Sequence, residues 1–178
     1  MRYVALLRAV NLGGHRKVGM AELRELLSFL GYSDVSTYIQ SGNALFTSPE
    51  DDAGALEREI EQAIEQRFGM DVPVLLRTPN ELAAVIAGNP FPHALTSPSR
   101  FYVAFLSGQP DPDALAQIDA QQFVPEEFAP GERAMYVWYP NGLNASKLSN
   151  TFWEKHLGVT ATSRNWNTVN KLLELARD

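Results

Sequence analysis

Cationic and amide side chains, together with a pair of glycines, gather in four short stretches of the sequence where they could hold a ligand. We call the first two stretches the first cluster, which comprises Arg8, Asn11, Gly13, Gly14, Gln40, Ser41 and Asn43. The other two stretches form the second cluster, which comprises Lys147, Arg164, Asn165 and Asn167. Arginine presents a planar fork of donors to phosphate or carboxylate, lysine presents a point charge, and consecutive glycines let backbone N–H groups turn toward an oxyanion. These residue types favour the binding of an anion or of an amide-bearing base.

Several kinds of chemistry lack the residues that they need. The chain has no cysteine, which excludes disulfides, thiolate nucleophiles and zinc held by cysteine. The histidines His15, His93 and His156 lie far apart without metal-ligand spacing, so we expect no metal site. The glycine pair has neither the spacing of a P-loop nor that of a dinucleotide-binding loop. The residues indicate no particular cofactor.

Charge and hydropathy bound the partners and the location. With 15 basic and 21 acidic residues and a pI near 5.1, the chain lacks the positive charge that a broad nucleic-acid-binding face requires. No run of about 18 apolar residues could span a membrane, and Arg8 interrupts the apolar start of the chain too early for a signal peptide. We therefore expect a cytoplasmic protein without membrane contact, built as one domain or as two small halves that share a core.

The first cluster must be positioned by the elements of residues 1–88. Apolar periodicity and the breakers between segments predict strand 2–7, helix 20–30, strands 35–40 and 44–47, helix 51–68, strand 72–76 and helix 78–88. The first six of these elements follow the order β-α-β-β-α-β, which is typical of ferredoxin-like folds.

A similar order of elements follows a Pro-rich linker, residues 89–99. We predict strand 101–106, helix 112–120, a hairpin of 123–129 with 133–139, helix 146–157, strand 160–163 and helix 167–177. The sequence therefore predicts an α+β fold of two ferredoxin-like halves in tandem, residues 1–88 and 100–178, with helices packed on antiparallel sheets in one compact unit. The duplication rests on the order of elements, because no residue-level repeat links the halves.

Strand direction predicts which polar residues meet. In a β-α-β-β-α-β unit the first strand ends beside the turn that joins the second and third strands, so Arg8 and Asn11 should approach residues 40–43. By the same geometry, the segments after Tyr139 and Ser163 leave the second sheet at a common end. Lys147 should therefore approach residues 164–167.

Structural roles could explain part of both clusters. The glycine pair could form only a loop, and residues 41–43 could form only a turn. Asn165 or Asn167 could cap the last helix, because asparagine accepts bonds from the free N–H groups at a helix start. Capping leaves the cations of both clusters unexplained.

Four motifs occur in a fixed order along the chain: YVALLRAVNLGG, GYSDVSTYIQSGNALF, YPNGLNASKLSN and GVTATSRNWNTVNKLLELA. Together they resemble the DUF1697 family, a bacterial family of unknown function. The resemblance implies an α+β fold of two ferredoxin-like halves, and it places the family's signature polar positions on both clusters and on Gly42, Ser146 and Thr168. This chain has Ala9 where members commonly have glycine. No activity comes with the resemblance.

The leading hypothesis is a site between the halves that binds a small anionic molecule, carrying phosphate or carboxylate, or a nucleotide. An alternative is an enzyme of phosphoryl or acyl transfer that uses the same cations, although no histidine or paired carboxylate is placed as its base. A second alternative is single-stranded nucleic-acid binding on a sheet face, which the acidic net charge opposes. A third is a polar network that holds the structure together without a ligand. The sequence identifies neither the ligand nor the oligomeric state.

Overall fold

Strand β1 (Arg2–Leu7) lies inside a four-stranded sheet of the computed structural model, which describes residues 1–178. The strand order is β2-β3-β1-β4, and all neighbouring strands are antiparallel. The other elements of this sheet and its helices are α1 (Met20–Phe29), β2 (Ser33–Tyr38), β3 (Asn43–Thr47), α2 (Ala53–Phe68) and β4 (Val74–Arg77). Residues 3–7 are all apolar and buried, as expected for a strand in the middle of a sheet.

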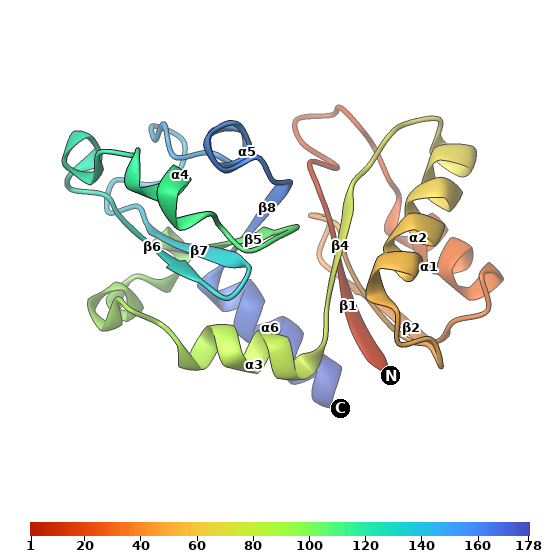
Figure 1. Ribbon diagram of the computed structural model, residues 1–178. Coiled ribbons are helices and arrows are strands. Elements are labelled where there is room, and N and C mark those ends of the chain that lie inside the picture. The colour runs from red at the N-terminus through yellow and green to blue at the C-terminus, as the bar shows by residue number, and fades with distance from the viewer. The chain divides into compact units, whose positions relative to one another are not determined.

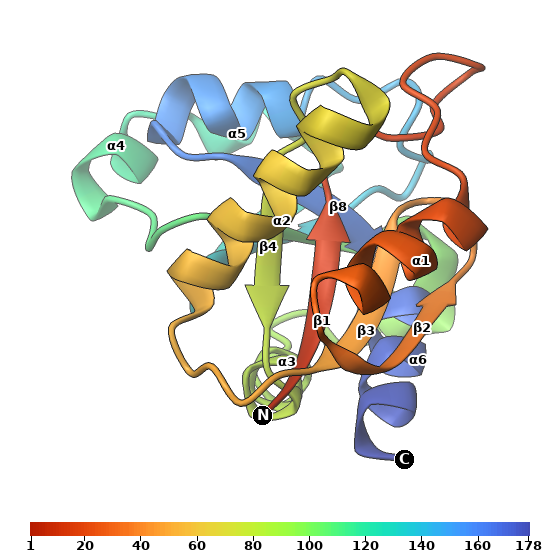
Figure 2. The same cartoon turned by 90° about the vertical axis from the view of Figure 1, so that its right-hand side faces the viewer.

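Helices α1 and α2 cover one face of this sheet (Figures 1 and 2). Both helices present an apolar stripe to the strands, formed by Met20, Leu23, Leu26, Leu27, Leu56, Ile60 and Ile64. Helix α2 begins where the Asp52 carboxylate accepts a bond from the N–H of Ala55 at 3.1 Å, and it ends at Gly69 with φ of 69°. Burial of each large aliphatic side chain stabilises the packing by about 1.5–3 kcal/mol.

The outer edge of β4 is covered by carboxylates from α2. Glu61 accepts a bond from the N–H of Val74, and Glu57 accepts one from the N–H of Leu76, both at 2.9 Å. These two N–H groups belong to an edge strand, where unpaired donors invite pairing with another chain. The helix therefore protects the edge, at the cost of drawing Glu61 out of water.

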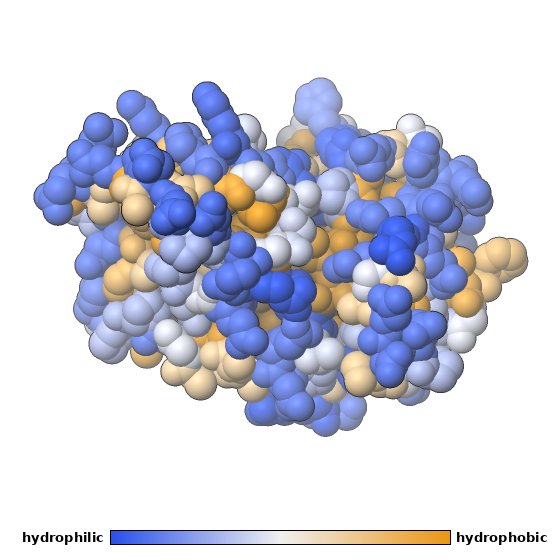
Figure 3. Space-filling model, viewed as in Figure 1, coloured by the Kyte–Doolittle hydropathy of each residue, from blue (hydrophilic) through white to orange (hydrophobic).

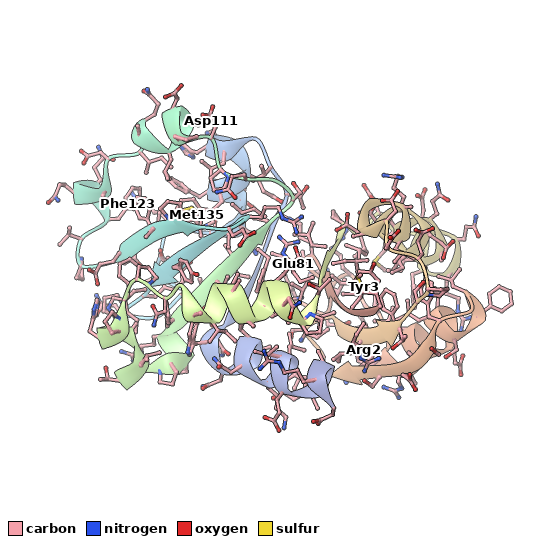
Figure 4. The ribbon with its side chains drawn as sticks, turned by 60° about the horizontal axis from the view of Figure 1, so that its bottom comes forward. Arg2, Tyr3, Glu81, Asp111, Phe123 and Met135 are labelled. Carbon is pink, nitrogen blue, oxygen red and sulfur yellow. The ribbon has the colours of Figure 1, made fainter.

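The second sheet repeats the arrangement, with strand order β6-β7-β5-β8 and antiparallel neighbours throughout. Its elements are β5 (Phe101–Leu106), α4 (Pro112–Ala116), β6 (Glu127–Gly131), β7 (Ala134–Trp138), α5 (Asn150–Leu157) and β8 (Ala161–Asn165). One face packs in an apolar group around Trp153, and this group includes Met135 of β7 and Phe123, which Figure 4 marks. The chain thus has a mixed α+β fold with two four-stranded antiparallel sheets.

The two central strands carry the same three residues at the same register. Residues 3–5 and residues 102–104 both read Tyr-Val-Ala. The valine of each pairs with an arginine on the edge strand, Val4 with Arg77 and Val103 with Arg164. The two central strands therefore share three residues at matching register, which the sequence alone does not bring out.

Two compact units divide the chain, residues 1–81 with 172–178 and residues 82–171. The boundaries fall inside helices α3 (Pro79–Ala87) and α6 (Trp166–Arg177). These units differ from the predicted halves, 1–88 and 100–178, because residues 82–99 belong to the second unit and residues 172–178 to the first. Tyr136 donates a buried 2.6 Å bond to the backbone oxygen of Val85, and the ring of Phe91 contacts that of Phe101. The expected linker contains two short 3-10 helices, Pro92–Thr96 and Pro98–Arg100.

Helix α5 begins later than the sequence pattern predicts. Ser149 is its N-cap, since the Ser149 hydroxyl accepts a bond from the N–H of Phe152, and Ser146 lies outside the helix. Helix α4 is also shorter than expected, because the chain turns into a separate 3-10 helix at Ala120–Phe123. No helix of the structure is long and apolar enough to cross a membrane.

The turn between β2 and β3 leaves no room for a side chain at Gly42. A Cβ atom there would lie 2.7 Å from Val10 Cγ2 and 2.9 Å from Leu7 Cβ, and the φ of Gly42 is 90°. The N–H of Leu7 donates to the oxygen of Gly42 at 2.9 Å. The end of β1 is therefore pressed directly against this turn.

We expect Gly42→Ala to destabilise the protein by about 2 kcal/mol or more, because the new methyl group both clashes and occupies left-handed backbone. Urea unfolding measures the loss. Gly13→Ala is the matched control, since Gly13 also has positive φ but has nothing within 4 Å of its Cβ position. It should cost only about 1 kcal/mol. Equal losses for the two variants would contradict the packing argument.

Glu61→Gln should change the pH dependence of stability. Burial raises the pKa of Glu61, although its bond to Val74 opposes the shift. Because the folded state then holds the proton more tightly than the unfolded state, the wild-type protein loses stability as pH rises from the usual carboxyl range through the raised pKa. The glutamine variant should therefore gain relative to wild type across that window, as urea midpoints measured at several pH values will show. Glu65→Gln, at an exposed position of the same helix, is the control for the loss of one negative charge from α2.

Candidate functional site

Asn11 joins the loop after β1 to the turn between β2 and β3. Its Nδ2 donates to the backbone oxygens of Val18 at 2.9 Å and Gln40 at 2.6 Å, and its Oδ1 accepts a bond from the N–H of Val18 at 2.8 Å. The residue has φ of 58°, a left-handed conformation that asparagine tolerates. The structure thus brings Asn11 to Gln40, two members of the first cluster.

Arg16, which no sequence pattern pointed to, fixes the same loop from its other side. Its Nε donates to the oxygen of Ala9 at 2.8 Å and its Nη2 donates to the oxygen of Asp71 at 2.7 Å. Both acceptors are backbone carbonyls, so this guanidinium positions the loop rather than offering its fork to a ligand.

Gly13 and Gly14 form the tip of a small hairpin. Their φ angles are 56° and 83°, Leu12 pairs with His15, and the N–H of His15 donates to the oxygen of Leu12 at 2.9 Å. Two central residues with positive φ define a type I′ turn. The turn itself accounts for the glycine pair.

Asn43 and Ser41 close the β2–β3 turn from within. Asn43 is fully buried, and its Nδ2 donates to the oxygen of Tyr38 at 3.1 Å and to Ser41 Oγ at 3.0 Å. Asn43 therefore has a structural role in the turn.

Arg8 lies half-buried at the end of β1, where its backbone N–H donates to the oxygen of Pro73 at 3.0 Å.

A surface pocket of about 400 Å³ collects part of the first cluster at the start of α1. Its lining residues are Asn11, Gly14, Lys17, Val18, Gly19 and Gln40. Lys17 is the only ionisable residue among them, and both Lys17 and Gln40 are exposed. The pocket therefore joins three predicted residues with a cation that the sequence analysis overlooked.

Helix α1 begins at this pocket without a side-chain cap. Its N-cap is Gly19, and no side chain bonds to the first turn as a cap. The first N–H groups of a helix have no partner inside the helix and carry partial positive charge. Glu22 partly offsets that charge, because its Oε1 lies 3.1 Å from the Cβ position of Gly19, but Arg67 pairs with the same carboxylate at 3.6 Å.

The second cluster follows β8, and its arginine is buried. Arg164 Nη1 donates to Thr162 Oγ1 at 2.8 Å and to the oxygen of Ser163 at 2.9 Å. Burial lowers the pKa of Arg164 to about 10, because the charged form is taken out of water. These contacts give Arg164 a role in holding the end of its own strand.

The asparagines of the second cluster differ in their surroundings. Asn165 Oδ1 accepts a bond from the N–H of Thr168 at 2.9 Å, which caps α6. Asn167 and Lys147 are exposed. Ser146, beside Lys147, donates to Glu126 Oε1 and accepts from the N–H of Leu148, both at 2.9 Å.

Groups of three or more side chains that could hold a metal ion are absent from the structure. His93 pairs instead with Glu127 at 2.5 Å, and His156 stacks on Phe152 with ring centres 4.1 Å apart. Neither histidine therefore belongs to a group of three metal-binding side chains.

Comparisons with known proteins identify the family. The model of a family described as proteins of unknown function, DUF1697, matches residues 1–136. No curated protein matches the chain. The solved structure of the conserved bacterial protein SP0830 from Streptococcus pneumoniae is similar, with 26% sequence identity, a TM-score of 0.69 and coverage of 98% of both chains. Because the family model covers more than half of the chain, this protein belongs to the DUF1697 family.

Proposed function

We propose that the first unit binds a small molecule carrying phosphate or carboxylate in the pocket at the start of α1. The observation that carries the proposal is the gathering of Asn11, Gly14 and Gln40 with the exposed cation Lys17 in one pocket. No acidic side chain lines this pocket, and the nearby carboxylate of Glu22, beside Gly19, pairs with Arg67, which offsets part of its repulsion of an anion.

Some residues of the pocket hold its loops in place, and others contact the ligand. Asn11 uses both Nδ2 hydrogens and its Oδ1 on backbone groups, so it holds the two loops in place. Lys17 supplies a point charge, and Gln40 supplies an exposed amide. The N-cap Gly19 also lines the pocket, so an anion there lies near the start of a helix, where phosphate is commonly bound. Lys17 is the only ionisable group of the lining and is used here to hold the anion, which leaves no second group for acid–base work, so binding is the function proposed.

We also propose that each unit is a ferredoxin-like half and that the protein is cytoplasmic. The element order β-α-β-β-α-β and the strand orders β2-β3-β1-β4 and β6-β7-β5-β8 support the comparison. That the second cluster contributes to the same site stays a prediction.

Lys17→Ala should abolish anion binding while leaving the fold intact, because Lys17 is exposed and carries the charge of the pocket. The measurement is a thermal-shift screen of inorganic phosphate, pyrophosphate, nucleotides, sugar phosphates and dicarboxylates, followed by calorimetry on any hit. A ligand at about 100 times its Kd adds about 2.7 kcal/mol of stability.

Lys147→Ala is the matched control, since Lys147 is an exposed lysine of the second cluster. Unchanged binding in this variant restricts the site to the first cluster, whereas an equal loss shows that both clusters contribute. The proposal fails if no anion stabilises the protein, or if the stabilisation survives Lys17→Ala.

A second candidate function is a polar network that holds each unit together without a ligand. Specific contacts favour it, because Asn43 and Asn165 spend side-chain atoms on backbone groups of their own unit, and buried Arg164 does the same. Satisfied buried networks of this kind define a unique packing.

Asn11→Gly tests the network at the residue that joins the two loops. Glycine tolerates the positive φ of this position but loses three hydrogen bonds, so we expect a stability loss of about 2 kcal/mol or more. Urea unfolding and the anion screen are both run on this variant. Wild-type stability of this variant would contradict the network, and anion binding unchanged in a destabilised variant would show that the pocket does not depend on Asn11.

A further inference from the structure

Phe29 ends helix α1 with its side chain in solvent, at 91% exposure. One exposed aromatic residue needs no special explanation. Phe29, however, is also one wall of a hollow of about 430 Å³ between α1 and α2, whose other lining residues are Glu25, Leu26, Leu30, Ala63, Gln66 and Arg67. In Figure 3 hydrophobic surface projects at the edge of the molecule over the end of α1.

The hollow has an apolar floor and a polar rim. Leu26 is buried in the core beneath it, and Leu30 and Ala63 pack partly against the same core. Glu25, Gln66 and Arg67 surround these residues. Such a hollow would accept a projecting aromatic ring that is surrounded by polar residues. The centre of a protein interface is apolar and its rim is polar.

We propose that this face of α1 and α2 binds a second copy of the chain, with Phe29 of each copy seated in the hollow of the other. In a two-fold contact both copies use the same surface, so that surface must carry both the projecting group and the hollow that receives it. Here the projecting ring and the hollow adjoin each other on one face, which meets that requirement.

The charges of the rim support a second copy over another occupant. Arg67 lies 3.6 Å from Glu22 and 3.7 Å from Glu25, and all three side chains are about half exposed or more. Arg24 lines a neighbouring hollow together with Glu25 and Phe29. Because the rim carries both signs, two copies related by a two-fold axis can each place an arginine against the other's glutamates. A strongly acidic or basic partner would instead meet like charges.

Sedimentation of the full chain over about 1 µM to about 1 mM tests the proposal, since weak self-association lies in that range. The apparent mass should rise with concentration from 19.8 kDa toward twice that value. Phe29→Ser should raise the dimer Kd at least about 10-fold, as removal of a central aromatic anchor does. Ala63→Glu, which puts a charge on the floor of the hollow, should have the same effect.

Leu12→Ser is the control, because Leu12 is 60% exposed but lies outside this face. It should associate like wild type, and circular dichroism should show all variants folded. A monomeric wild-type chain at every concentration overturns the proposal, as does Phe29→Ser that sediments like wild type or Leu12→Ser that weakens association equally. A fold lost in Phe29→Ser leaves Ala63→Glu as the decisive variant.

Discussion

The contact between the end of β1 and the β2–β3 turn is the constraint on which the candidate site depends. Gly42 packs against Leu7 and Val10 without space for a methyl group, and its oxygen accepts the N–H of Leu7. This contact brings residue 40 to the loop after β1, where Asn11 bonds to it. Without such close approach, the pocket at the start of α1 would lose one of its walls.

The sequence predicted the elements well because their apolar periodicity matches what the core buries. Strand β1 and strand β5 have the predicted bounds, and α1 differs from its prediction by a single residue. Helix α5 was misplaced at its start because Ser146 and Ser149 are both good N-caps, and only tertiary contacts decide between them. Ser146 bonds to Glu126, which draws it away from the helix.

The roles of the candidate site residues were harder to predict than the elements that carry them. Asn11, Asn43 and Asn165 were predicted as ligand-binding residues, but their side chains bond mainly to the backbone of their own unit. The sequence alone does not show whether an amide side chain is available to a ligand or bonds to the backbone of a loop. Lys17 was missed because an isolated lysine before a helix reads as solvated charge. Its position three residues before the first residue of an uncapped helix was the available signal.

The comparison of the two units explains why the proposed pocket lies in the first one. In both units a loop leads from the central strand into a helix, β1 to α1 and β5 to α4. Helix α1 starts at Gly19 beside Lys17, whereas α4 starts at Asp111, whose carboxylate accepts the N–H of Asp113 at 3.0 Å. A carboxylate at that position already satisfies the helix start and repels anions. At the same topological position, α4 thus has a carboxylate bonded to its first turn, whereas α1 has no side-chain cap and its first-turn acid, Glu22, pairs with Arg67.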